Sequence, residues 1–169
     1  MSVNSEDVVK KFVEGFNRHD GSVMQLFSRD NTWLDPGALE PEEGWERMQK
    51  GLLSAYKVFD EAKLEPSHVV ANGDWACFDG FFTGIFRGGK WFANGKEWNL
   101  PPTRRSVKLS TAWFFKVNSD GLISYWSWYW DNFRFFSQIG LRPDQIGMSP
   151  EQVRTDTPTS TSRLQSTQS

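Results

Sequence analysis

The sequence is poor in cysteine and histidine, and this excludes several kinds of protein. With Cys77 as its only cysteine the chain cannot form an intrachain disulfide, which fits a reducing compartment. A structural zinc site needs several nitrogen or sulfur ligands, but His19 and His68 lie far from Cys77 and from each other in the sequence. We therefore expect no zinc site, while a metal site built from carboxylates alone stays open.

An excess of one charge and long hydrophobic runs are also missing. The formal net charge is −2, which gives no electrostatic footprint for nucleic acid or for an acidic membrane surface. The first eleven residues lack the apolar core of a signal peptide, and no apolar run approaches the roughly 18 residues of a membrane span. We expect no nucleic-acid or membrane partner and a cytoplasmic location.

Length and composition predict one folded domain followed by a polar tail. The 169 residues, 38% of them hydrophobic, suffice for a single sizeable core. Residues 148–169 are rich in Ser, Thr, Gln and Pro, and so cannot bury enough surface to offset the entropy of ordering. The predicted organisation is one domain over residues 1–147 and a disordered tail over residues 148–169.

The first third of the chain has helical patterns. A first helix is predicted by five apolar residues on one helical face, with Asn4 or Ser5 as its cap: Val8, Val9, Phe12, Val13 and Phe16. A short second helix is expected over residues 23–27, and a third over about residues 42–56. Between them, residues 32–35 form a predicted strand that Pro36 stops, which places Asp35 at a strand end.

From residue 62 onward the patterns are those of strands. Predicted strands over residues 64–71 and 75–87 flank an Asn-Gly hairpin turn. After a predicted loop over residues 88–105, strands over 107–117 and 122–130 form a second hairpin. Gly80 and Gly84 lie inside a strand, where glycine often marks a bulge or a bend. The predicted fold class is α+β, with a curved antiparallel sheet wrapped around N-terminal helices.

The densest aromatic stretch, residues 123–131, ends in a carboxylate. Desolvation among large apolar rings raises the pKa of a carboxyl group toward neutrality, where it can both donate and accept a proton. Asp131 is therefore the leading catalytic candidate, and its structural alternative is the cap of a following helix. Strand alternation places Asp131 on the side of Tyr125, Ser127 and Tyr129.

The same alternation places three tryptophans together on the other side of this strand. If Asp131 faces a pocket, Trp126, Trp128 and Trp130 face outward, and a dimer interface is the simplest cover for them. A bulge would instead bring the tryptophans into the pocket.

Four local patterns, in this order, resemble the SnoaL-like polyketide cyclases of the nuclear transport factor 2-like superfamily, which has a cone-shaped fold. They are Phe16-Asn17-Arg18-His19-Asp20, Asp35-Pro36-Gly37, the segment from Pro101 to Val107, and Asp131 placed seven residues before Gln138-Ile139-Gly140. Together they span about residues 6–143. The family's usual Thr-Gly-Arg is Thr103-Arg104-Arg105 here.

The resemblance implies a homodimer of cones, each with an apolar pocket inside the curved sheet, and an enzyme of secondary metabolism. In such cyclases the acid matching Asp131 is the general acid/base of an intramolecular aldol closure, without metal or organic cofactor. The context of Asp35 is similar to the catalytic base segment of the ketosteroid isomerases. The position of that family's catalytic tyrosine is Phe12 here, and the position of its protonated aspartate falls near Ala112. Both hydrogen-bond donors are therefore missing, which argues against a steroid isomerase.

These observations predict a cofactor-independent cyclase, isomerase or lyase that acts on a hydrophobic aromatic or polyketide-like molecule. Asp131 is the expected general acid/base, and Asp35 is a second catalytic residue that assists it. The candidates for substrate binding are Trp33, His68, Asp79, Trp113 and Tyr129. Ring closure, isomerisation, dehydration, epoxide opening and retro-aldol cleavage all need such proton transfers. The alternatives are a noncatalytic carrier or sensor of a hydrophobic ligand and, less favoured, a protein-interaction module.

Overall fold

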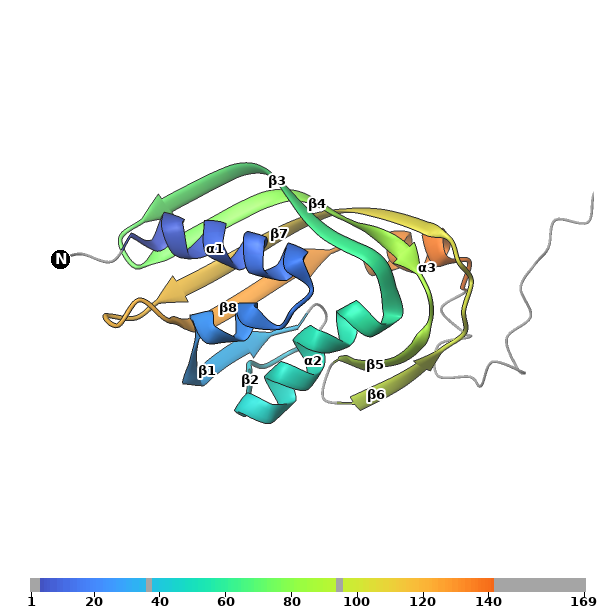
Figure 1. Cartoon of the computed structure of the whole chain (residues 1–169), viewed down its shortest axis with the longest axis horizontal. Helices are drawn as coiled ribbons and strands as arrows, with labels where there is room; N and C mark the ends of the chain where they lie inside the picture. The colour runs from blue at the N-terminus through green and yellow to red at the C-terminus, as the bar shows by residue number, and fades with distance from the viewer. Residues whose placement is uncertain (1–3, 36–37, 94–95, 142–169) are drawn as a thin grey trace, which may run out of the picture.

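Two long helices lie against the concave side of a curved six-stranded sheet (Figure 1). The computed structural model describes residues 4–35, 38–93 and 96–141. In chain order the elements are α1 (Ser5–Arg18), the 3-10 helix η1 (Ser22–Leu26), β1 (Phe27–Leu34), β2 (Glu42–Glu43), α2 (Trp45–Val58), β3 (Phe59–Asn72), β4 (Trp75–Phe86), β5 (Gly89–Ala93), β6 (Lys96–Leu100), β7 (Ser106–Val117), β8 (Ile123–Trp130) and α3 (Asn132–Ile139).

The sheet order is β2-β1-β8-β7-β4-β3, and every neighbouring pair is antiparallel except β1 and β8, which run parallel. The two long hairpins, β3–β4 and β7–β8, are those that the sequence predicts. The parallel contact between β1 and β8 joins segments about 90 residues apart, so no local pattern could reveal it. The predicted α+β class, with helices inside a curved sheet, is confirmed.

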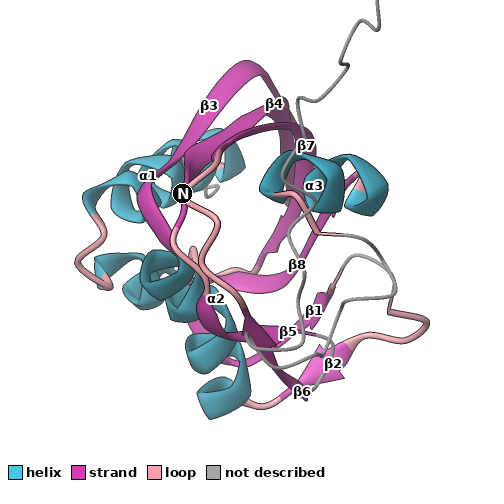
Figure 2. Cartoon of the chain, turned by 90° about the vertical axis from the view of Figure 1, so that its right-hand side faces the viewer, coloured by secondary structure: helices cyan, strands magenta, loops and turns pink. Residues whose placement is uncertain are grey.

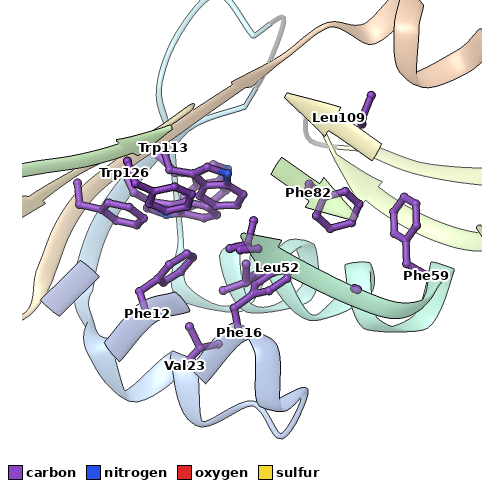
Figure 3. Close-up of a cluster of buried hydrophobic side chains, with 14 of the residues drawn as sticks. Phe12, Phe16, Val23, Leu52, Phe59, Phe82, Leu109, Trp113 and Trp126 are labelled. Carbon is purple, nitrogen blue, oxygen red and sulfur yellow. The ribbon is translucent and has the colours of Figure 1, made fainter. Parts of the chain in front are cut away.

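The helix α1 forms where its apolar spacing predicts it. The side chain of Asn4 caps the helix by accepting a hydrogen bond from the backbone N–H of Glu6, at 3.2 Å. The buried face of α1 meets the sheet, where Phe12 lies near Trp113 (Figure 3). The ring centroid of Phe12 is 5.4 Å from that of Trp113 and 4.8 Å from that of Phe115. This helix therefore fills one end of the concave face with aromatic rings.

The bend of the sheet has a local cause at Gly80. The β3–β4 register shifts between Pro66 and His68, opposite this glycine, as in a β-bulge. A Cβ atom at Gly80 would lie 2.2 Å from the carbonyl oxygen of Glu65, so only glycine allows the two strands to approach this closely. The bend predicted from the glycine is confirmed, and it curves the sheet over α1 and α2 (Figure 2).

The segment predicted as a loop over residues 88–105 contains a hairpin instead. Strands β5 and β6 pair with each other, with Trp91 opposite Trp98, and β5 packs beside α2 (Figure 1). Trp91 of this segment packs against the rings of Phe59 and Trp130. The polar tail predicted over residues 148–169 lies outside the described residues, and no described helix is long and apolar enough to cross a membrane.

Candidate active site

An aromatic cavity lies between the concave face of the sheet, α2 and β5. The volume that the centre of a water-sized sphere can occupy inside it is about 50 Å³. The lining combines side chains from the sheet, both long helices and the β5–β6 hairpin: Phe16, Trp33, Asp35, Arg47, Met48, Gly51, Leu52, Ala55, Phe59, Phe82, Trp91, Phe92, Trp113, Trp126, Trp128 and Trp130. A concave, mostly apolar cavity with few polar groups is the usual form of a small-molecule site.

Three tryptophans form the sheet-side wall of the cavity. The indole planes of Trp113, Trp126 and Trp128 lie within 13–19° of one another, and their ring centroids are 4.9–5.6 Å apart. Trp113 of β7 is directly opposite Trp128 of β8, and Trp126 precedes Trp128 on the same face. Figure 3 shows Trp113 and Trp126 overlapping above the rings of α1. This wall is therefore a cluster of three indole rings stacked with an offset.

Asp35 is the one carboxylate among the described residues that line the cavity. It follows β1 directly and is only 6% exposed. Its backbone carbonyl accepts a hydrogen bond from the N–H of Ala38, at 3.0 Å, which closes the turn after the strand. The sequence placed Asp35 at a strand end, and the structure adds that this end opens into the aromatic cavity.

Arg47 is the one cationic side chain among the described residues that line the cavity. Its guanidinium donates a hydrogen bond to the carboxylate of Glu42, which holds one end of the group at the surface. About half of the Arg47 side chain is exposed, so it lies at the edge of the cavity rather than in its interior. No sequence pattern singles out this arginine.

Asp131 lies outside the cavity lining. Its side chain is exposed, and Oδ1 accepts a hydrogen bond at 3.0 Å from the backbone N–H of Arg134, as the N-cap of α3. The capping alternative describes this geometry, whereas the burial on which the catalytic prediction depends is not observed, since Asp131 is exposed. A catalytic role of Asp131 stays a prediction.

The three tryptophans of β8 face the cavity, not the outside. Trp126, Trp128 and Trp130 all line it and Asp131 does not, so the condition under which they were expected to face outward is not met. The β7–β8 register shift precedes Tyr125, and from Tyr125 to Trp130 the pairing is regular, so no bulge near Asp131 was needed to turn the rings inward. From Trp126 to Trp130, the even-numbered residues of β8 direct their side chains to the concave side of the sheet.

Three predicted substrate-binding residues lie on the opposite, convex face of the sheet. His68 Nδ1 lies 2.9 Å from Asp79 Oδ1, and both side chains are largely exposed. Asp79 and Tyr129 border a separate open hollow on that face. His68, Asp79 and Tyr129 therefore do not line the aromatic cavity, while Trp33 and Trp113 do.

Several cavity residues had no functional prediction. Met48 and Leu52 come from the apolar face of α2, whose four-residue spacing the sequence shows. Trp91 and Phe92 stand in the predicted loop, where two adjacent large aromatic residues were a signal of burial. Among residues 4–35, 38–93 and 96–141, no three His, Cys, Asp or Glu side chains gather as metal ligands.

Arg104 stands where the family pattern has glycine. Its φ of 56° lies in the left-handed region, which glycine adopts without steric cost. The side chain donates to Asp60 Oδ2 at 2.7 Å, and Arg87 donates to Oδ1 of the same carboxylate. The departure from the family pattern thus places an arginine in a left-handed backbone conformation and adds an ion pair.

Comparison with known proteins agrees with this fold. The family model of the SnoaL-like domain matches residues 9–126. A candidate polyketide cyclase from Xanthomonas campestris has a TM-score of 0.67 at 20% identity, over 80% of this chain and 96% of its own. IdmH, a candidate polyketide cyclase from Streptomyces antibioticus, has a TM-score of 0.64 at 21% identity, over 82% and 99%.

A protein with a ketosteroid isomerase-like fold from Catenulispora acidiphila also matches, with a TM-score of 0.64 at 14% identity over 82% of this chain and 95% of its own. At these identities the structural matches show the fold alone. No curated protein matches the sequence. The family model covers more than half of the chain, and the chain therefore belongs to the SnoaL-like domain family.

Proposed function

We propose that the protein is a cofactor-independent acid/base enzyme that acts on a hydrophobic aromatic or polyketide-like molecule in the aromatic cavity. One observation carries the proposal: a buried carboxylate, Asp35, borders a cavity whose other walls are almost entirely aromatic and aliphatic. We assign the proton transfer to Asp35 in the first place. Asp131, which the family resemblance favours, is the second candidate.

The chemistry follows from the surroundings of the carboxylate. Stacking on the tryptophan wall would hold a planar substrate, and the rings of β5 and α2 would keep bulk water away from it. A carboxylate placed there can remove a proton next to a carbonyl group and return it to another atom of the substrate. Ring closure, isomerisation, dehydration, epoxide opening and retro-aldol cleavage share this step, and the fold does not choose among them.

The family supports the substrate class. Two of the matching structures are those of candidate polyketide cyclases, which supports a polyketide-like substrate for this chain. An enzyme of secondary metabolism is the corresponding proposal for this chain. Its cytoplasmic location stays a prediction from the sequence.

The position of Asp131 favours a second function. Because the acid that the family resemblance marks as catalytic is exposed and caps α3, the cavity could serve a noncatalytic carrier or sensor. In that case the walls would bind a hydrophobic ligand and no proton transfer would follow.

Metabolite comparison in the source organism separates these proposals. Strains carrying Asp35→Asn, Asp131→Asn or the native protein are compared, with Asp30→Asn, an exposed acid of β1, as the matched control. Accumulation of one precursor and loss of its product with Asp35→Asn alone is the expected result, and it would identify the substrate. The same change with Asp131→Asn alone would move the acid/base role to that residue. Unchanged profiles with all three folded variants would favour the carrier.

We also propose a homodimer, formed through the convex face of the sheet. With the tryptophans of β8 inside, this face still exposes several large apolar side chains: Val70, Trp75, Phe114 and Tyr129. Exposed contiguous apolar surface usually marks an interaction site. Sedimentation velocity at micromolar concentration should give twice the monomer mass, and a monomer there would refute this proposal.

A further inference from the structure

Helix α3 is fastened to the sheet by a side-chain amide. Gln138 Nε2 donates a hydrogen bond to the backbone carbonyl of Lys108 at 2.8 Å, and Gln138 Oε1 accepts one from the N–H of the same residue at 2.7 Å. Strand β8 ends at Trp130, which is opposite Thr111 of β7, so β8 does not reach Lys108. The amide of Gln138 therefore satisfies backbone groups that a neighbouring strand would otherwise satisfy.

Asp131 fastens the other end of the same helix, as the N-cap that accepts from the N–H of Arg134. The seven residues from Asp131 to Gln138 correspond to about two helical turns, and α3 has eight residues. At the C-terminal end the guanidinium of Arg105 covers Gly140, where a Cβ atom would lie 2.5 Å from Arg105 Cζ. A helix this short is not stable by itself, so these contacts determine its position.

The buried side of α3 supports two rings of the cavity lining. Phe135 is 1% exposed, and its ring centroid lies 5.5 Å from that of Trp130 and 5.4 Å from that of Trp91. Both tryptophans line the aromatic cavity. Trp130 Nε1 also donates to Oδ1 of Asn132, the first residue of α3, at 2.8 Å. The position of α3 therefore determines where these two indole rings lie.

We propose that Gln138 is a positioning residue of the aromatic cavity, which acts through Phe135 to hold Trp91 and Trp130 in the wall that contacts the substrate. This inference rests on the proposed function in taking the cavity as the substrate site. It gives Gln138 a role in substrate binding, and it gives Asp131, at the other end of α3, a role that needs no proton transfer.

The sheet holds these two rings less firmly than the others. Trp113 and Trp126 lie inside strands that are paired on both sides. Trp130 is instead the last residue of β8, and Trp91 belongs to β5, which pairs with β6 in a separate two-stranded sheet. Because strand pairing does not join Trp91 to Trp130, the contacts that both rings make with Phe135 are important for their relative position.

A second amide of the same kind provides a matched control. Asn17, near the end of α1, donates to the carbonyl of Leu64 at 3.0 Å and accepts from its N–H at 2.8 Å. Leu64 belongs to β3, which is the edge strand of the sheet. The preceding residue, Phe16, has its ring centroid 6.4 Å from that of Trp113. This amide therefore fastens a different helix, beside a different part of the lining.

Spectra of the free protein test the positioning directly. Gln138→Met keeps the length of the side chain and removes both hydrogen bonds, whereas Gln138→Glu keeps the acceptor for the N–H of Lys108. In ¹H–¹⁵N spectra the indole N–H signals of Trp91 and Trp130, assigned with single Trp→Phe variants, should move most in Gln138→Met and less in Gln138→Glu. Asn17→Leu should leave both signals in place. Unmoved signals in Gln138→Met, or equal movement in Asn17→Leu, would overturn the inference.

Binding of 1-naphthol, a planar aromatic probe, gives the second measurement. By isothermal titration calorimetry its Kd should rise about 3- to 10-fold in Gln138→Met and less than about 2-fold in Asn17→Leu. Since Gln138 acts through Phe135, Gln138→Met should change the Kd little when Phe135→Leu is already present. Additive effects of these two changes would overturn the inference. No binding of the probe to the wild type at millimolar concentration would overturn the proposed function as well, which unmoved indole signals would not do.

Discussion

The two faces of the β7–β8 hairpin contain similar residues in very different surroundings. On the concave face Trp126, Trp128 and Phe115 pack under α1 and α2, and Phe115 is fully buried. On the convex face its neighbour Phe114 is 38% exposed, and Tyr129 is 48% exposed. Aromatic content therefore does not locate the site by itself. The side on which the helices pack determines which face of the sheet lines the cavity.

The two strand-end carboxylates differ for the same reason. Strands β1 and β8 are parallel, so Asp35 and Asp131 follow strand ends at the same edge of the sheet. Leu34 is opposite Ser127, which makes Asp131 about three residues, or roughly 10 Å, farther along than Asp35. Asp35 also shares the inward parity of Trp33, whereas Asp131 shares the outward parity of Tyr129. The alternation of side chains and the position along the strand therefore explain why Asp35 is buried and Asp131 is exposed.

The largest expected difference between the two faces is in stability. Phe115→Ala should lower the free energy of unfolding by about 3–5 kcal/mol, because it leaves a cavity among the rings of Phe12, Phe78 and Trp113. Phe114→Ala, the matched change on the convex face, should cost less than about 1 kcal/mol in a monomer. Urea denaturation followed by circular dichroism measures both.

This pair of variants can also break the comparison. Equal costs at low protein concentration would mean that the convex face is as well packed as the concave one. A cost for Phe114→Ala that grows with protein concentration would instead indicate that this face is buried in the proposed homodimer.

A smaller effect is expected at the exposed carboxylate. If Asp131 mainly caps α3, Asp131→Ala should lower the free energy of unfolding by about 1 kcal/mol, while Asp131→Asn should cost almost nothing because Asn is an equally good cap. Thermal unfolding of the two variants measures this. Equal destabilisation by Asn and Ala would show that the charge, and not the capping hydrogen bond, is the important property of this residue.

The sequence predicts local features well and the cavity only in part. The α1 cap, the two long hairpins and the bend at Gly80 each depend on residues close in the sequence, and all three are confirmed. The orientation of β8 depends instead on its parallel contact with β1 and on where the helices pack. Alternation could sort its residues into two sets, but it could not say which set faces inward. The hydrogen bonds of Gln138 to the backbone of Lys108 are visible only in three dimensions.

The smallest effect should come from the ion pairs of Asp60 with Arg87 and Arg104. Hydrogen bonds from Arg87, with the charges of Arg87 and Arg104, hold the pKa of Asp60 below its ordinary value of 3.8. A carboxyl group with a lowered pKa in the folded state stabilises the fold above that ordinary value, and the benefit is lost as the pH falls through the folded-state pKa. Asp60→Asn should therefore slightly lower the melting temperature at pH 7, and the difference from wild type should shrink below about pH 4. A difference that stays constant down to pH 2 would mean that the carboxylate acts through its packing and not through its charge.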